Sequence, residues 1–392
     1  MAEHGPSPTP LARRLARIQP FHVMALLARA RELEAAGRSV VHMEIGEPDF
    51  ATPEPIVEAG RAALAAGRTH YTPAAGLPEL RAAIAGFYTS RYGVTVEPGR
   101  VVVTPGASGA LQLVLSVLVD PGTRVLLTDP GYPCNRNFVH LVDGLPVSVP
   151  VSAGDGYQFS AARARDLWTP DTAAMLVASP ANPTGAVLSE AQLRSLAEVA
   201  HTGGGRLIVD EIYHGLSYGI DDVTALAVSD RVFVINSFSK YFGMTGWRLG
   251  WVVAPQDYVA DLEKLAQNLF LSAPTPAQYA ALSAFEPATI ALLEERRQAF
   301  RERRDYLLPA LRELGFAIPR APEGAFYLYA DCSRFTDDSF AFARDLLEQA
   351  GVAITPGVDF GNHQPERHVR FAYTTGLDEL REGVARLRAY LR

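Results

Sequence analysis

Lysine is almost missing from this sequence. Lysine and arginine together number 36, yet lysine occurs only at Lys240 and Lys264. Arginine keeps its proton in a protein, whereas burial can lower the pKa of a lysine until its amine is a neutral nucleophile. Lys240 is the lysine followed by a glycine-punctuated loop that reaches Arg248. A lysine at this position, in a chain that otherwise uses arginine, indicates that the amine itself is required. On this observation alone, the alternative is an ordinary surface lysine.

Other absences exclude whole classes of protein. Two cysteines, Cys134 and Cys332, are too few for a disulfide framework, and neither has a metal-type spacing to histidine, so we expect no metal. The sequence has no run of 18 apolar residues and no apolar signal-peptide core near its start, which predicts a cytoplasmic protein that does not bind membranes. A net charge of −7 without a basic stripe argues against nucleic-acid binding.

The length of 392 residues exceeds one compact core. From residue 101 onward, β-branched apolar runs end abruptly in Gly, Pro, Asp or Ser and alternate with helical stretches. Runs that are apolar on both faces and alternate with helices predict a mostly parallel sheet covered by helices on both sides. A short strand is predicted over 40–45. After residue 285, a long charged helix and short strands over 325–329 and 368–373 predict a smaller α+β domain. The predicted fold class is therefore α/β, with a large domain over 46–285 and a small domain over 11–45 and 286–392. Residues 1–10, which are polar and rich in proline, are predicted to be flexible.

The predicted strands end in residues suited to binding a ligand. Gly106, Ala107 and Ser108 open a helix, where free backbone N–H groups bind phosphate readily, and Ser237, Ser239 and Arg248 follow a later strand. Tyr132 follows another strand, where its ring can stack on a planar ligand.

The remaining strand ends carry Asn182, held between two prolines, and Asp210 with Tyr213 three residues on. In parallel sheets ligands bind beyond the carboxyl ends of the strands, so these groups converge. Together with Lys240, these residues suit a ligand that has a phosphate, a planar ring, a ring nitrogen that pairs with an acid, and a carbonyl group that reacts with a lysine. That ligand is pyridoxal 5′-phosphate.

The sequence also resembles a known family over nearly its whole length, the class I/II pyridoxal-phosphate aminotransferases of fold type I, the aspartate aminotransferase-like superfamily. The motifs that carry the resemblance are I-G-E-P-D-F, Y-T-P-A-A-G-L-P-E-L-R, T-P-G-A-S, S-P-A-N-P-T-G, D-E-I-Y, S-F-S-K, G-W-R-L-G-W and H-V-R-F-A-Y. The resemblance implies an aminotransferase, a transferase of amino-acid metabolism that works as a homodimer with ping-pong kinetics.

The resemblance also implies roles for individual residues. Lys240 binds the cofactor covalently and acts as the base, Asp210 pairs with the ring nitrogen, and Asn182 and Tyr213 bond the ring 3-oxygen while Tyr132 stacks on the ring. The phosphate is held by Gly106, Ala107, Ser108, Ser237 and Arg248, with Tyr71 reaching it from the partner subunit. Arg370 grips the substrate α-carboxylate, aided by Asn182 and the Gly46 backbone.

Arg370 has a physical case of its own. Val369 and Phe371 point to one face of a strand, so Arg370 points to the other. A guanidinium matches a carboxylate two bonds at a time, which fixes orientation as well as charge.

The substrate is less well defined by the sequence. Relatives that use aspartate supply a second cation for its distal carboxylate, and one branch has a lysine where this chain has Ser108. Another branch has an arginine near residues 272–278, where this chain has none. Phe21, Ile18 and Phe326 can line an apolar pocket, or they are core residues. We therefore expect a neutral or aromatic amino donor with 2-oxoglutarate or pyruvate as acceptor. Aspartate aminotransferase is the alternative.

Two further alternatives belong to other classes. A pyridoxal-phosphate C–S lyase would use the same scaffold and release pyruvate and ammonia without an oxo-acid acceptor. A transcription regulator built on an aminotransferase-like domain would carry an N-terminal DNA-binding domain, and only about 40 residues precede I-G-E-P-D-F, with no basic recognition helix.

Overall fold

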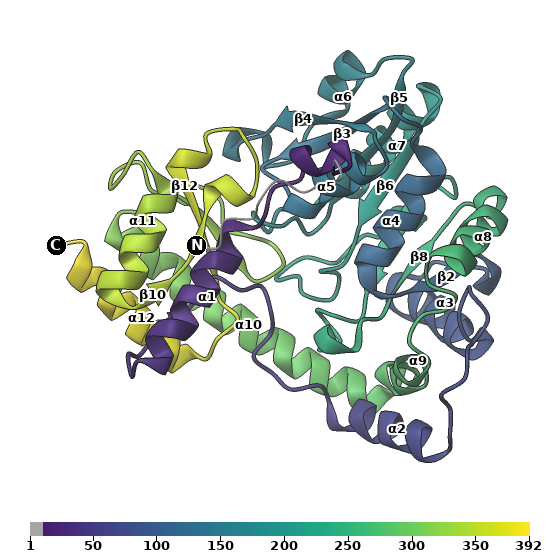
Figure 1. The fold of residues 1–392 in the computed structure, drawn as a ribbon, viewed down its shortest axis with the longest axis horizontal. Coiled ribbons are helices and arrows are strands. Elements are labelled where there is room, and N and C mark those ends of the chain that lie inside the picture. The colour runs from purple at the N-terminus through teal and green to yellow at the C-terminus, as the bar shows by residue number, and fades with distance from the viewer. Residues whose placement is uncertain (1–10) are drawn as a thin grey trace.

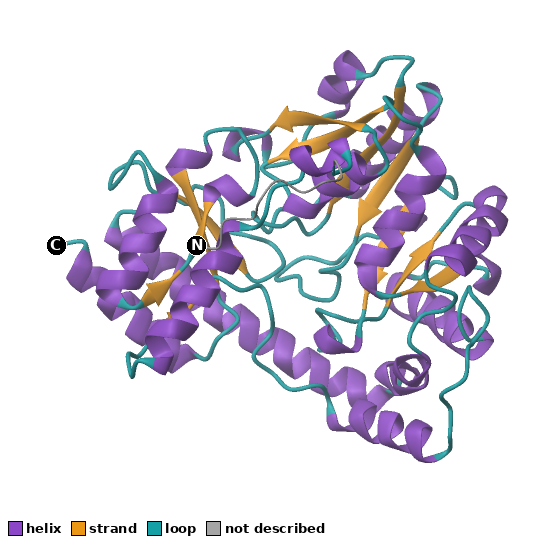
Figure 2. Ribbon diagram, viewed as in Figure 1, coloured by secondary structure: helices purple, strands orange, loops and turns teal. Residues whose placement is uncertain are grey.

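A seven-stranded sheet forms the centre of the molecule in the computed structural model, which describes residues 11–392 (Figures 1 and 2). In spatial order its strands are β2 (Val101–Thr104), β8 (Gly250–Val253), β7 (Phe233–Ser237), β6 (Arg206–Asp210), β5 (Thr172–Ala178), β3 (Arg124–Asp129) and β4 (Leu145–Pro150). β8 is antiparallel to both of its neighbours, and the other strand pairs are parallel. The prediction of a mostly parallel sheet is confirmed.

Both faces of this sheet are buried, as the apolar runs predict. In β6, Ile208 packs into one hydrophobic cluster while Leu207 and Val209 pack into the other. The helices that pack on the Ile208 face are α4 (Gly106–Leu118), α5 (Pro133–Leu141) and α8 (Val259–Leu269). The helices in the cluster of the opposite face include α3 (Pro78–Tyr92), α6 (Ala161–Leu167), α7 (Glu190–Thr202) and α9 (Thr275–Leu282).

A second part of the molecule, on the left of Figure 1, is built around small sheets. An antiparallel sheet has the order β11 (Thr355–Pro356), β12 (His368–Ala372) and β9 (Tyr327–Asp331), and β1 (Val41–His42) pairs in parallel with β10 (Val352–Ala353). The helices here are α1 (His22–Ala35), α11 (Ser339–Asp345) and α12 (Leu377–Tyr390). The 28-residue α10 (Pro287–Leu314) runs from this part toward α2 (Glu54–Ala65) and α9.

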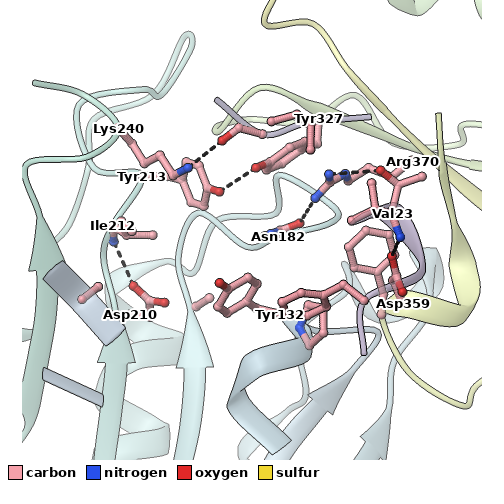
Figure 3. A pocket seen from close by; sticks show the side chains of 18 of the residues that line it. Val23, Tyr132, Asn182, Asp210, Ile212, Tyr213, Lys240, Tyr327, Asp359 and Arg370 are labelled. Carbon is pink, nitrogen blue, oxygen red and sulfur yellow. Dashed lines mark hydrogen bonds between the residues drawn. The ribbon is translucent and has the colours of Figure 1, made fainter. Parts of the chain in front are cut away.

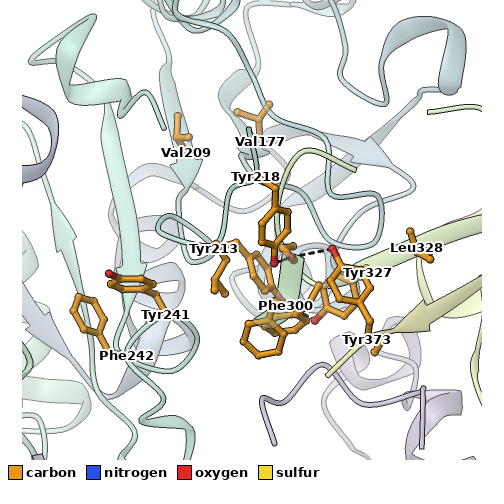
Figure 4. Packing of buried hydrophobic residues seen from close by; sticks show 14 of the residues in the cluster. Val177, Val209, Tyr213, Tyr218, Tyr241, Phe242, Phe300, Tyr327, Leu328 and Tyr373 are labelled. Carbon is orange, nitrogen blue, oxygen red and sulfur yellow. Dashed lines mark hydrogen bonds between the residues drawn. The ribbon is translucent and has the colours of Figure 1, made fainter. Parts of the chain in front are cut away.

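Some element boundaries differ from those predicted. The strand predicted over 40–45 covers only Val41–His42, and the strand predicted over 325–329 begins two residues later, at Tyr327. Ala325 lies just before it with a φ of 59°, and its carbonyl accepts hydrogen bonds from the hydroxyls of Tyr218 at 2.6 Å and Tyr373 at 3.2 Å. Figure 4 shows these two tyrosines within the buried cluster. The chain therefore turns at Ala325 before it can extend.

The predicted domain limits at residues 45 and 286 stay a prediction, and the flexible segment predicted over 1–10 lies outside the described residues. Among residues 11–392, no helix is both long and apolar enough to cross a membrane.

Candidate active site

A cavity of about 250 Å³ opens between the strand ends of the seven-stranded sheet and the three-stranded sheet (Figure 3). Asp210 is the last residue of β6, Lys240 follows β7, and Arg370 comes from β12 on the opposite side. The predicted site residues that line the cavity are Phe21, Gly46, Ala107, Ser108, Tyr132, Asn182, Asp210, Tyr213, Lys240 and Arg370. Segments more than 300 residues apart in sequence therefore meet at one site.

An adjoining cavity contains the hydroxyl-rich end of β7. It shares Lys240 and Tyr132 with the first cavity and adds Ser237, Ser239 and Arg248. Arg248 adopts a left-handed backbone conformation, with a φ of 54°, and its guanidinium packs so closely on Gly106 that a Cβ there would lie 2.5 Å from Nη2. Gly106 thus allows a cation to approach the first turn of α4.

Lys240 is the amine at the centre of the cavity. Its Nζ donates a hydrogen bond to the carbonyl of Gly46 at 2.5 Å. Burial lowers the pKa of Lys240 to about 8, and the charges of Arg370 and Arg248 act in the same direction. At pH 7.5 roughly a quarter of such amines are neutral, against about one in a thousand at an ordinary lysine. The position therefore favours a nucleophile.

Asp210 is a buried carboxyl group, with 5% of its surface exposed. Its Oδ1 accepts the backbone N–H of Ile212 at 3.1 Å. Burial raises the pKa of Asp210 to about 6, although this N–H acts in the opposite direction. A protonated ring nitrogen beside the carboxylate would offset its burial, as the predicted pairing requires.

Arg370 is held from three sides, and two of its five N–H donors, one on Nη1 and the Nε–H, have no partner among the described residues. Its Nη1 donates to Asn182 Oδ1 at 2.8 Å, and its Nη2 donates to the carbonyl of Glu44 at 2.6 Å and to Thr355 Oγ1 at 3.2 Å (Figure 3). The buried Nε has no hydrogen-bond partner among the described residues. The guanidinium is therefore oriented, with a donor available for a carboxylate.

Tyr327 is a cavity residue that the sequence did not reveal. Its hydroxyl lies 2.7 Å from that of Tyr213, and its ring centroid lies 4.2 Å from the Arg370 guanidinium carbon. Phe326, predicted at this place, does not line the cavity; it is fully buried against Phe300 and Tyr213. Neighbouring side chains at the start of β9 point to opposite faces, so Tyr327 faces the cavity while Phe326 points into the core.

Two further predicted residues lie apart from the first cavity. Ile18 is partly exposed and does not line it. Tyr71 is 80% exposed and belongs to neither cavity of this chain.

Two buried polar residues that the sequence did not reveal, Glu211 and His214, stabilise the turn that carries Asp210 and Tyr213. Glu211 Oε2 lies 3.3 Å from His214 Nδ1, both side chains being buried. Glu211 Oε1 accepts the N–H of Ala225 at 2.7 Å. No local sequence pattern marks Glu211 for this role, because the N–H that it accepts belongs to Ala225, 14 residues further along the chain.

The donor set fits pyridoxal 5′-phosphate. The first turn of α4, the hydroxyls of Ser237 and Ser239, and Arg248 form a cradle for an anion, and the N–H groups at a helix start have no partner within the helix. The Asp210 carboxyl group lies in the cavity next to this cradle, as does the Lys240 amine. The described residues contain no cluster of three or more His, Cys, Asp or Glu side chains that could hold a metal ion.

Comparison with known proteins gives the same answer. Residues 38–387 match the family described as aminotransferase class I and II. The chain is 38% identical to the valine–pyruvate aminotransferase of Mycobacterium tuberculosis (96% of this chain, 97% of the relative). It is also 38% identical to the aspartate/prephenate aminotransferase of Thermus thermophilus (96% and 97%). A crystal structure of an aminotransferase from Mycobacterium tuberculosis superimposes with a TM-score of 0.94 at 38% identity, covering 98% of this chain and 99% of that one. The chain belongs to the class I and II aminotransferases and is an enzyme that uses pyridoxal 5′-phosphate to transfer amino groups.

Proposed function

We propose that the enzyme transfers the amino group of a neutral, apolar or aromatic L-amino acid to a 2-oxo acid. Lys240 holds the cofactor and Asp210 pairs with its ring nitrogen, with Tyr132 stacked on the ring and Asn182 and Tyr213 at its 3-oxygen. The phosphate is bound by Gly106, Ala107, Ser108, Ser237, Ser239 and Arg248. Arg370, Asn182 and the Gly46 backbone hold the substrate α-carboxylate.

The side chains of the protein contribute only a few steps to the chemical reaction. When bound, the cofactor supplies a conjugated ring that absorbs the electrons of the substrate carbanion. Arg370 fixes the carboxylate and so orients the Cα–H bond. Lys240, once freed from the cofactor, takes the proton from Cα at Nζ, because its lowered pKa leaves a large neutral fraction near pH 8. Asp210 keeps its charge opposite the ring nitrogen throughout.

The charges on the cavity wall are the observation that supports a neutral substrate side chain. Among the described residues that line it, the only cations are Lys240 and Arg370, both of which already have proposed roles. Ser108 stands where one aspartate-using branch of the family has a lysine. Asp359 adds a buried carboxylate. A distal carboxylate on the substrate would therefore find no free cation among the described lining residues.

The rest of the wall is apolar. The start of α1 contributes Phe21, Val23 and Met24, and Phe360 packs beside Arg370 at 4.9 Å from ring centroid to guanidinium carbon. Burying an apolar side chain on these groups stabilises the complex by about 1.5–3 kcal/mol.

A panel of half-reactions tests this substrate class. Holoenzyme is mixed with one amino acid at a time, without an oxo acid, and the change in the visible absorbance of the cofactor is followed. We expect valine, leucine and phenylalanine to convert the cofactor at least about tenfold more efficiently than aspartate, the discrimination that one unpaired buried charge supplies. Faster conversion by aspartate would contradict the proposal, and pyruvate release without an acceptor would favour the C–S lyase.

We also propose a homodimer in which Tyr71 completes the phosphate site of the partner subunit. The large exposed surface of Tyr71 in the isolated chain supports this, since a tyrosine is seldom left so open. A Tyr71→Ala enzyme should remain dimeric and bind the cofactor at least about fivefold more weakly, as expected for one lost hydrogen bond to a charged group. The measurements are light scattering and cofactor titration, with exposed Leu64→Ala as the control. A fully active monomer would refute the proposal.

A further inference from the structure

Two segments from different sheets are joined beside the cavity. One segment, residues 129–132, follows β3 of the seven-stranded sheet, and the other, residues 359–363, precedes β12 of the three-stranded sheet. The Asp129 carboxylate accepts the N–H of Asn362 at 2.9 Å and that of His363 at 3.2 Å. The N–H of Gly131 donates to the carbonyl of Phe360 at 2.8 Å. We call this pair of segments the seam.

The centre of the seam, Asp129 and Gly361, is buried and leaves no room for a side chain at Gly361, whereas Asn362 beside it is exposed. Asp129 is 3% exposed, although it carries a carboxylate. The three atoms nearest to a Cβ built on Gly361 all belong to the Asp129 carboxyl group, and the closest, Oδ1, would overlap it. Asp129 and Gly361 therefore depend on each other. The carboxylate fits only because residue 361 has no side chain, and the loop uses the carboxylate as its hydrogen-bond acceptor.

The second segment of the seam, residues 359–363, supports the side of the cavity where we place the substrate. Asp359 accepts the N–H groups of His22 and Val23, each at 2.8 Å, and so fixes the start of α1, which contributes Val23 to the cavity wall. Phe360 lines the cavity and packs on the Arg370 guanidinium. Figure 3 shows Asp359, Val23 and Arg370 on one side of the cavity, across from Asp210. Moving this loop would move both the carboxylate clamp and the side-chain pocket.

We propose that Asp129 is a positioning residue for the amino-acid substrate: by holding residues 361–363 it fixes Asp359 and Phe360, and through them the α1 start and Arg370. Asp129 touches neither substrate nor cofactor in this proposal, which rests on the proposed role of Arg370. Its effect is on binding of the amino acid, because the Asp129 carboxylate accepts hydrogen bonds from the N–H groups of Asn362 and His363 on the substrate side, and from no group of Tyr132 on its own segment.

A double-mutant cycle tests the proposal. Asp129→Ala leaves two partly buried N–H groups without their protein acceptor, and Gly361→Ala forces the loop away from the carboxylate; each should raise the KM for the amino donor by on the order of tenfold to hundredfold. In the double variant the carboxylate that blocks the new Cβ is gone. The KM of the double variant should therefore equal that of Asp129→Ala alone, a strongly non-additive result.

Three controls separate positioning from general damage. The visible spectrum and the cofactor dissociation constant should stay those of the native holoenzyme, and kcat at saturating donor should fall much less than kcat/KM. Gly86→Ala makes the same chemical change at an exposed position of α3, where nothing lies within 4 Å of a new Cβ, and should leave KM unchanged. If Gly361→Ala does not fold, Asp129→Asn is compared with Asp129→Ala instead: the amide keeps one acceptor oxygen, so its KM should lie between those of the native enzyme and Asp129→Ala, with cofactor binding unchanged in both.

Additive effects on KM, or equal losses in cofactor binding and in KM, would overturn the proposal. Failure of the proposed substrate site has a different signature: Arg370→Ala would then leave KM unchanged, whichever result the seam variants give.

Discussion

Replacing Lys240 with alanine should lower transamination by at least about four orders of magnitude, because the change removes the amine that we propose as both the covalent holder of the cofactor and the base at Cα. Its burial and its contact with the Gly46 carbonyl place this amine in the cavity, and its lowered pKa makes it reactive. The measurement is steady-state turnover together with the absorption spectrum of the reconstituted protein. Full turnover with an unchanged visible band would contradict the assignment.

The chain offers its own matched control. Lys264, the other lysine, is exposed on α8 and pairs with Asp261 at 2.5 Å, so Lys264→Ala should keep full activity. Lys240→Arg is the complementary variant. It keeps a positive charge in the cavity but cannot give up its proton, so it should be as inactive as Lys240→Ala. An active Lys240→Arg enzyme would show that charge alone suffices.

The strand-end residues were predictable because a parallel sheet brings the carboxyl ends of its strands together. Asp210 and Tyr132 follow parallel strands, and each apolar run marks where its strand ends. The direction of Arg370 followed from alternation in β12: its neighbours Val369 and Phe371 are fully buried in the core cluster, whereas Arg370 lines the cavity. Local periodicity was enough in these cases.

Other features depend on contacts that no local pattern encodes. One such feature is the turn at Ala325, just before the position where Tyr327 and not Phe326 lines the cavity. Hydroxyl groups of Tyr218 and Tyr373, from distant segments, hold this turn. Asp359 and the start of α1 are separated by 337 residues, and their hydrogen bonds arise only in the folded chain. A carboxylate near the end of a sequence has many possible partners, so its burial beneath a helix start could not be read from the residues around it.

Replacing Arg370 with alanine should lower kcat/KM for every amino donor by about two to three orders of magnitude, the usual cost of removing one partner of a buried charge pair. The loss is expected to be similar for valine and phenylalanine, because the guanidinium binds the α-carboxylate that all donors share. The measurement is the half-reaction rate over a range of donor concentrations. A change confined to one donor would place Arg370 at the side-chain pocket instead.

The effect should include a geometric part beyond charge. Arg370→Lys keeps the cation, but a lysine cannot reach Asn182, the Glu44 carbonyl and a carboxylate together, as the fork of the guanidinium can. Its kcat/KM should fall between those of the native enzyme and Arg370→Ala. Arg367→Ala is the control, because Arg367 lies three residues away, pairs with Asp331 at 3.0 Å and does not line the cavity. If Arg370→Lys were as active as the native enzyme, net charge alone would bind the substrate, and the three partners that hold the guanidinium would serve stability only.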